Sequence, residues 1–195
     1  QPVNGRQVNR HPTLTCLSLT ALSSELGPRR PHKEEPVRAS TDDNRVVRTY
    51  RQTIDAPPAV VFPLLCPVRE AEWLAGWRFT MIYSASGVVE EGAVFATSFD
   101  VEADTLWIVS RHDREAGAVE FARFTPGSRT CLLKIAVSPF GNQRSHVDVS
   151  YAYTALSPAG EAFLAAWTNE KFLTDVVFWE RSMNHYLETG TQLIK

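Results

Sequence analysis

The stretch IDAPPAVVFPLLCPVREAEWLAGW, residues 54–77, decides the fold. Its apolar residues recur at helical spacing, but Pro63 and Pro67 interrupt the pattern, because a proline inside a helix removes a hydrogen bond and clashes with the preceding turn. The stretch therefore predicts two short helices, over about 57–65 and 68–76, in place of one long helix.

Segments rich in β-branched and aromatic residues flank these two helices, as is typical of strands. One segment precedes the helices and six follow, at 46–54, 78–85, 92–99, 105–112, 117–125, 129–137 and 145–155. Glycine and asparagine separate successive segments, and connections this short imply an antiparallel meander. Alternation predicts that one face is buried, with Cys131, Leu133, Ile135, Val137, Val147, Val149, Tyr151 and Tyr153 pointing inward.

The final segment predicts a long amphipathic helix. Ser157 caps its start, Pro158 suits its first turn, and Gly190 marks its end. Its apolar stripe comprises Phe163, Leu164, Trp167, Leu173, Val176, Val177, Met183 and Leu187. We expect a kink or break near Thr168-Asn169.

Composition favours one domain. The chain has 195 residues, is 44% hydrophobic and carries a net charge of −2, which gives no footprint for binding nucleic acid. Residues 1–44 are proline-rich and lack periodicity, so we expect a disordered or non-core tail before a single domain at 45–195. No apolar run reaches the roughly 18 residues of a membrane span. Three cysteines without CxxC spacing favour a reduced, cytoplasmic setting.

The order of these elements resembles the SRPBCC or START-like superfamily. The resemblance covers about residues 46–190. "IDAPPAVVFPLL" is similar to the family's entry into its first helix, and "YAYTALSPAGEAFL" to its last strand and long helix. "CPVREAEWLAGW" and "NHYLETG" look like a bacterial subgroup of the polyketide cyclase/dehydratase type. The resemblance implies an α+β helix-grip fold: a curved seven-stranded antiparallel sheet around the C-terminal helix, usually with an apolar cavity. It carries over no catalytic residue.

Strand alternation and the helical stripe together predict the residues of such a cavity. They are Trp73, Trp77, Arg123, Leu133, Ile135, Val149, Tyr151, Tyr153, Val176, Val177, Glu180 and Met183. Two points stay open. Trp73 and Trp77 either form a lid wall or are core contacts, and Arg69 and Glu70 either pair with each other or supply polar groups to the cavity.

Glu180 lies on the apolar stripe, where a buried carboxylate needs a partner. Arg123 shares strand parity with Val119 and Phe121, and it is the most plausible cation for that role. The pair is either structural or part of a ligand site. Catalytic residues stay unassigned, since the histidines show no metal spacing and no nucleotide-binding loop is present. We expect no metal and no cofactor.

Three functions remain in competition. The leading hypothesis is binding of a small apolar or amphipathic molecule between the sheet and the C-terminal helix. The first alternative is a cyclase/dehydratase-type enzyme that uses a cavity carboxylate with arginine or tyrosine. The second is a protein-interaction module of the chaperone-activator kind, which needs an exposed apolar patch. We expect a monomer or weak dimer.

Overall fold

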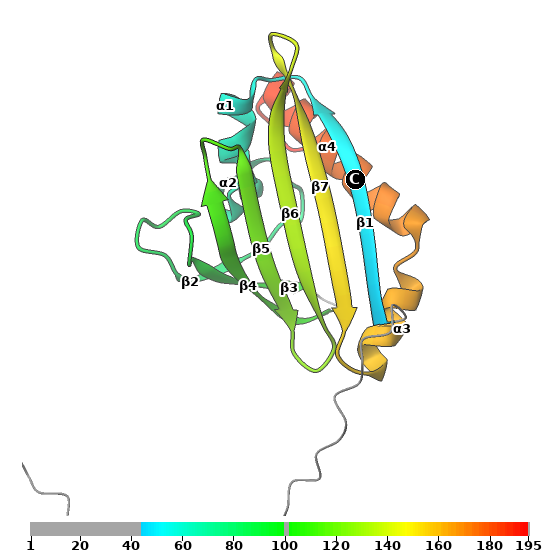
Figure 1. The fold of residues 1–195 in the computed structure, drawn as a ribbon. Helices are drawn as coiled ribbons and strands as arrows, with labels where there is room; N and C mark the ends of the chain where they lie inside the picture. The colour runs from blue at the N-terminus through cyan, green and yellow to red at the C-terminus, as the bar shows by residue number, and fades with distance from the viewer. Residues whose placement is uncertain (1–43, 100–101, 195) are drawn as a thin grey trace, which may run out of the picture. The chain divides into compact units, whose positions relative to one another are not determined.

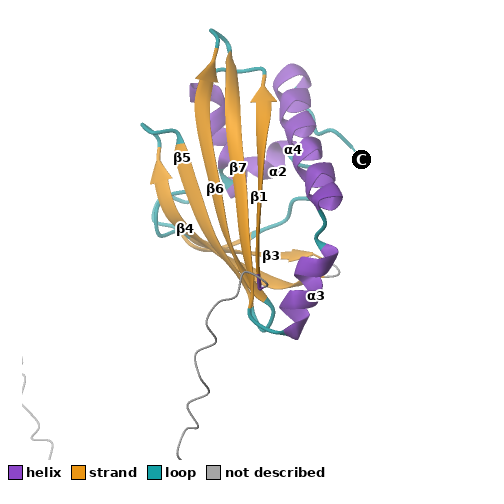
Figure 2. Cartoon of the chain, turned by 45° about the vertical axis from the view of Figure 1, so that its right-hand side comes forward, coloured by secondary structure: helices purple, strands orange, loops and turns teal. Residues whose placement is uncertain are grey.

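The computed structural model describes residues 44–99 and 102–194, where one antiparallel sheet carries the helices on one side (Figures 1 and 2). The strands are β1 (Arg45–Ile54), β2 (Thr80–Tyr83), β3 (Val94–Phe99), β4 (Glu102–Asp113), β5 (Ala118–Thr125), β6 (Arg129–Phe140) and β7 (Arg144–Ala155). The helices are α1 (Pro58–Val61), the 3-10 helix η2 (Phe62–Leu65), α2 (Pro67–Trp73), α3 (Pro158–Ala166) and α4 (Asn169–Thr189). The predicted α+β arrangement is confirmed.

The sheet is a meander whose first strand returns to the last. Its order is β1-β7-β6-β5-β4-β3-β2, and every neighbouring pair is antiparallel. Figure 2 shows the curvature, with β3 lying across the direction of β7. Short turns account for the order from β3 to β7, because a two- to four-residue connection can join only antiparallel neighbours. The hairpin strands β6 and β7 run longer at their shared turn than the sequence pattern predicted, and β2 is shorter.

The predicted inward faces of β6 and β7 are confirmed. Val149 on β7 lies opposite the half-buried Tyr50 on β1 and the buried Ile135 on β6, which places inward-facing side chains in one row across three strands. Lys134, next to Ile135, points to the outer face and is exposed. Because side chains alternate with period two, this register fixes which residues can reach the inner face.

The prolines divide the segment after β1 as predicted, but its second helix is shorter than expected. Helix α2 ends at Trp73, because Leu74 is already extended and Gly76 adopts the left-handed region at a φ of 82°. A loop, and not a helix face shared with Trp73, therefore places Trp77. Each indole N–H is satisfied separately: Trp73 donates to the Leu64 carbonyl oxygen at 3.0 Å and Trp77 to that of Pro67 at 2.9 Å.

The predicted break in the C-terminal helix is confirmed between α3 and α4. The Thr168 side chain accepts a hydrogen bond from the Lys171 N–H at 3.2 Å and so begins α4 as a separate helix. Because α4 begins anew at the break, its buried face does not continue the apolar stripe counted along α3. Part of the predicted stripe is therefore wrong, since Leu173 and Val177 are more than a third exposed. Phe172 and Trp179 are buried in their place.

Helix α4 packs against β1 and α2, and α3 packs against β7. Two clusters of buried side chains result. The larger one surrounds Trp73 and Phe95, and the smaller one surrounds Trp167 and Phe172. The predicted tail at residues 1–44 lies outside the described residues except for its last position. Within the described ranges, no helix has the length and apolarity that crossing a bilayer requires.

Candidate ligand-binding site

A cavity of about 800 Å³ lies between the inner face of the sheet, α2 with its following loop, and the α3–α4 helices. We call it the inner cavity. Its walls are Pro67, Glu70, Leu74, Ala75, Gly76, Trp77, Phe95, Trp107, Phe121, Arg123, Leu133, Tyr151, Tyr153, Phe163, Trp167, Lys171, Phe172, Asp175, Val176, Phe178 and Trp179. The cavity wall thus includes residues of both buried clusters.

Aromatic rings make up much of the wall on the β3–β5 side. Phe95 and Trp107 stack with centroids 5.2 Å apart, and the Phe121 ring meets the Trp107 ring edge-on at 5.9 Å. Trp77 approaches Trp107 from the α2 loop, again edge-on, at 6.0 Å. These side chains converge because Phe95, Trp107 and Phe121 occupy inward positions of neighbouring strands. The result is an aromatic surface that offers both ring faces and ring edges to a bound ring.

A second aromatic group faces it from the α3–α4 break. The Trp167 ring lies 4.7 Å from Tyr153 and 5.4 Å from Phe172, both edge-on. Trp167 and Phe172 come together because α3 ends at Ala166 and α4 begins at Asn169, and the turn between them changes the direction of the chain. Arg48 holds this turn from β1 by donating through Nε and Nη2 to the Trp167 carbonyl oxygen, at 3.2 and 3.0 Å.

Glu70 brings a carboxyl group into this apolar space. It lies on the inward side of α2 and is only 9% exposed. Burial raises the pKa of the Glu70 carboxyl from 4.5 to about 8, and the nearby Arg123 guanidinium opposes part of that rise. Desolvation dominates because it penalises the charged form more than one arginine at this position stabilises it. At neutral pH most Glu70 carboxyls therefore carry a proton.

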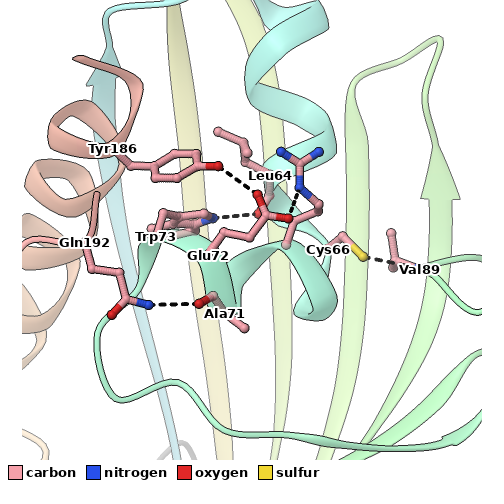
Figure 3. A network of polar contacts seen from close by, with 9 residues as sticks. Leu64, Cys66, Ala71, Glu72, Trp73, Val89, Tyr186 and Gln192 are labelled. Carbon is pink, nitrogen blue, oxygen red and sulfur yellow. Dashed lines mark hydrogen bonds and ion pairs between the residues drawn. The ribbon is translucent and has the colours of Figure 1, made fainter. Parts of the chain in front are cut away.

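The orientation of Glu70 follows from how α2 is anchored (Figure 3). On the outer side of α2, Glu72 pairs with Arg69 at 2.6 Å and accepts a hydrogen bond from the Tyr186 hydroxyl of α4 at 2.8 Å. Gln192 donates to the Ala71 carbonyl oxygen at 2.8 Å. Arg69 therefore pairs with Glu72 and not with Glu70, and the open choice for Glu70 resolves toward the cavity.

Cys66 stands at the start of α2. It is buried and unbridged, and its Sγ accepts a hydrogen bond from the Val89 N–H at 3.3 Å (Figure 3). Such a position is typical of a small structural side chain.

Arg123 provides the positive charge on the sheet side. Its Nη1 donates to the Tyr153 hydroxyl at 2.9 Å, and its Cζ lies 4.1 Å from the centroid of the Trp107 ring. Tyr151 lies one inward position from Tyr153, and burial raises the pKa of its hydroxyl, against the opposing effect of Arg123. We call Glu70, Arg123, Tyr151 and Tyr153 the polar cluster. It gives the cavity a hydrogen-bonding region between the aromatic side chains, in addition to the exposed Lys171 and Asp175 of α4.

The structure brings together half of the side chains that the sequence predicted for the cavity. Those that line it are Trp77, Arg123, Leu133, Tyr151, Tyr153 and Val176. Four others are fully packed in the core without lining the cavity, namely Trp73, Ile135, Val149 and Met183. Val177 lies on the outer side of α4.

The sequence suggested that Glu180 pairs with Arg123, but in the structure Glu180 has other partners. Its carboxylate accepts hydrogen bonds from the Tyr50 hydroxyl at 3.0 Å and from the Thr53 N–H at 2.8 Å. Both partners belong to the edge strand β1, because α4 packs beside β1 and not over the centre of the sheet. Glu180 therefore joins helix to strand outside the inner cavity.

The sequence left the role of Glu70 open and did not predict most of the aromatic residues of the cavity wall. Strand alternation could have identified Phe95 and Trp107 as inward-facing, because each lies two residues from another buried apolar residue, Ala93 and Val109 respectively. For Phe172 and Trp179, the signal was the cap at Thr168, which restarts the helical count. Counting from Phe172 gives Val176, Trp179 and Met183, all buried.

A second hollow, of about 570 Å³, lies over the outward-facing side chains of the sheet. We call it the outer hollow. Its charged residues already pair across strands, with Arg51 to Asp148 at 2.7 Å and Lys134 to Glu120 at 3.4 Å. These pairs are exposed, and the hollow has no aromatic wall. It therefore offers a small molecule less apolar burial than the inner cavity does.

No protein-family model matches the sequence, and no curated protein matches it in a sequence comparison. Solved structures do match the fold. Norcoclaurine synthase from Thalictrum flavum aligns over 74% of this chain and 94% of its own, at 13% identity and a TM-score of 0.57. The major latex-like protein 151 from Panax ginseng aligns over 73% and 97%, at 14% identity and a TM-score of 0.55.

A bacterial protein gives the same result. The Zhui aromatase/cyclase from Streptomyces sp. R1128 aligns over 76% of this chain and 99% of its own, at 9% identity and a TM-score of 0.54. At such identities the similarity concerns the fold alone. The chain shares the helix-grip fold of these structures, which is the fold that the resemblance to the SRPBCC/START-like superfamily implied.

Proposed function

We propose that this protein binds a small apolar or amphipathic molecule in the inner cavity. The observation that carries the proposal is the cavity of about 800 Å³ with many aromatic side chains in its walls and a polar cluster on one side. Cavities of roughly 300–1,000 Å³ with mostly apolar walls and a few convergent polar groups are typical of small-molecule sites. Stacked and edge-on rings favour an aromatic ligand, because they offer both faces and edges to a bound ring.

One structural neighbour supports this choice of ligand. Norcoclaurine synthase from Thalictrum flavum has been solved in complex with dopamine and hydroxybenzaldehyde, and it aligns over 74% of this chain at 13% identity and a TM-score of 0.55. Both molecules are small and aromatic. The walls described here offer room and apolar area for molecules of that kind.

A neutral fluorescent probe, N-phenyl-1-naphthylamine, tests the proposal directly. All five tryptophans of the chain lie at the cavity or against its wall, since Trp73 packs 5.7 Å from Trp179 and the other four line it. We expect saturable energy transfer from tryptophan to the probe at one site per chain. Absence of saturable binding would contradict the proposal.

Two adjacent residues give a matched pair of variants for locating the probe. Val176 lines the cavity, whereas Val177 points away from it and is 36% exposed. We expect Val176→Phe to weaken probe binding several-fold, because the larger ring intrudes into the cavity, and Val177→Phe to leave it unchanged. Equal effects would place the probe elsewhere. Native mass spectrometry of the purified protein would then identify any ligand retained from the host.

A second candidate function is catalysis by proton transfer, of the cyclase/dehydratase type. Glu70 favours it, because a cavity carboxyl group with a pKa of about 8 can both give and accept a proton near neutral pH. Glu180 no longer supports it, since its carboxylate lies outside the cavity. Catalysis predicts that a polyketide-like β-diketone substrate is consumed and that Glu70→Gln abolishes turnover while the substrate still binds.

We further propose a cytoplasmic monomer or weak dimer. Cys66 and Cys131 are buried as free thiols, which suits a reducing compartment. The deep cavity favours small-molecule binding over a protein-interaction module. Analytical ultracentrifugation at several concentrations tests the oligomeric state, and a stable higher oligomer would contradict it.

A further inference from the structure

The Glu70 carboxyl group is buried without a hydrogen-bonding partner. Among the described residues, no side chain or backbone group bonds to it, although it is only 9% exposed and lines the inner cavity. The Tyr151 hydroxyl, on the opposite wall, also makes no hydrogen bond in the described part of the chain. Buried polar groups are almost always paired, because leaving one unpaired costs its full desolvation. Tyr151 is half-buried, and both groups line the cavity. A molecule in the cavity can therefore supply the hydrogen bonds that the described residues do not.

The charged groups around Glu70 indicate which kind of molecule can bond to it in the cavity. Arg123 is the charged group that acts on Glu70, and it approaches from β5. Among the described residues, the other ionisable groups that line this space are Tyr151 and Tyr153 on β7 and Lys171 and Asp175 on α4. Cys131 and Arg129 on β6 lie close behind it, with the Arg129 guanidinium 3.5 Å from the centroid of the Phe163 ring. Lys171 and Asp175 are exposed, opposite in charge and one helical turn apart, so their effects largely offset each other.

We propose that the ligand of the inner cavity carries an acidic, acceptor-rich head group, a carboxylate or an acidic phenol, which lies between Glu70 and Tyr151 under the positive charge of Arg123. This inference rests on the proposed binding function and names the chemical class of the ligand. The aromatic walls hold the ring portion of the ligand, and the polar cluster holds its head.

Donor and acceptor chemistry supports this assignment. A protonated carboxyl group and a tyrosine hydroxyl each offer an O–H donor, whereas a carboxylate or phenolate offers only acceptors. Hydrogen bonds to a charged acceptor are stronger than neutral ones, and the Arg123 charge offsets the cost of bringing an anion out of water. An amine head group would meet the same arginine with unfavourable electrostatics.

The protonation state of Glu70 makes the inference dependent on pH. With a pKa of about 8, Glu70 is a donor at pH 6.5 and becomes a carboxylate above pH 8, where it would repel a bound anion. If only the protonated form binds the anion, affinity scales with its population. That population falls about thirtyfold between pH 6.5 and pH 9.5 for this pKa.

Three naphthalene probes of equal ring size test the head group. They are 2-naphthoate, the neutral 2-naphthylmethanol and the cationic 2-naphthylmethylammonium, each measured by competition against N-phenyl-1-naphthylamine at pH 6.5. We expect 2-naphthoate to bind at least tenfold more tightly than the alcohol, and the ammonium probe to bind most weakly. We also expect the affinity for 2-naphthoate to fall by about tenfold or more by pH 9.5, while that for the alcohol changes little.

Two variants assign the pH effect to one residue. Glu70→Gln cannot ionise, so its affinity for 2-naphthoate should vary by less than about threefold over the same pH range. Glu188→Gln makes the same substitution at an exposed position of α4, outside the residues that line the cavity, and should keep the full wild-type dependence. The wild-type comparison of probes and pH needs neither variant, so it decides the inference even if Glu70→Gln does not fold.

The outcomes separate this inference from the binding function on which it rests. Equal binding of the alcohol and 2-naphthoate, or tighter binding of the ammonium probe, overturns the acidic head group and leaves the cavity as a binding site. An affinity for 2-naphthoate that is independent of pH also overturns it. Failure of every probe, including N-phenyl-1-naphthylamine, contradicts the proposed function itself.

Discussion

Replacing Glu70 by glutamine should make the protein more resistant to unfolding at alkaline pH. In the folded protein, burial raises the pKa of Glu70 from 4.5 to about 8, so the folded state binds a proton more tightly than the unfolded chain does. Between these two values the unfolded state holds fewer protons at this site. The free energy of unfolding therefore falls as pH rises through that window, and the loss is complete above pH 8.

The size of the effect follows from the change in proton affinity. Each tenfold change in proton affinity corresponds to about 1.4 kcal/mol. The rise of the Glu70 pKa from 4.5 to about 8 would therefore lower the unfolding free energy of the wild type by about 5 kcal/mol above pH 8. Rearrangement around a buried charge reduces such penalties, and we expect about 2–5 kcal/mol. Glutamine has nearly the same shape and no charge, so Glu70→Gln avoids this loss.

Urea unfolding, followed by tryptophan fluorescence at half-unit steps from pH 5 to pH 9, measures the effect. The informative quantity is the difference in unfolding free energy between Glu70→Gln and wild type, because other titrating groups cancel in it. We expect this difference to favour the variant increasingly from pH 5 to above pH 8. Glu188→Gln, exposed on α4, should give a flat difference. Parallel curves for Glu70→Gln and wild type would refute the buried, ionisable position assigned to Glu70.

Three further outcomes test separate parts of the account. A chain that starts at Arg45 should melt within about 5 °C of the full chain, since residues 1–44 carry no periodic apolar face; a larger drop in Tm would contradict this. Glu180→Gln should lower the unfolding free energy by about 1–3 kcal/mol by weakening its bonds to the Tyr50 hydroxyl and one backbone N–H, yet leave N-phenyl-1-naphthylamine affinity unchanged. Gly160→Ala should cost about 1–3 kcal/mol in urea unfolding, because the added Cβ would collide with the Ser128 carbonyl oxygen; wild-type stability would show that the backbone can move aside.

Much of the fold was predictable because it depends on local and periodic signals. Prolines at 63 and 67 divide one helix into short ones, and alternation in β6 and β7 fixes which face is buried. The break at Thr168 was also visible as a polar cap within an apolar stripe. The sequence did not show which residues of α4 face the sheet after that break. A stripe counted straight through it selected Val177, which the structure turns outward.

The site was harder to predict, because it depends on where α4 lies across the sheet. Helical periodicity places Glu180 on a packed face, but it does not say which strand that face meets. In the structure the face meets β1, and Glu180 bonds there. The role of Glu70 also depends on tertiary contacts that the sequence does not reveal. Its neighbours Arg69 and Glu72 pair with each other, and Tyr186 of α4 holds Glu72 on the outer side of α2. Glu70 is therefore the carboxyl group of α2 that faces the cavity.

The claim that a small ligand occupies the inner cavity is tested most directly by ¹H–¹⁵N correlation spectra recorded during titration with 2-naphthylmethanol. The account predicts that the indole N–H signals of the four cavity-lining tryptophans shift together and saturate with one ligand per chain. It predicts no change at the backbone amides of Thr49, Lys134 and Ser150, which border the outer hollow. Shifts confined to those three amides, with unchanged indole signals, would contradict it.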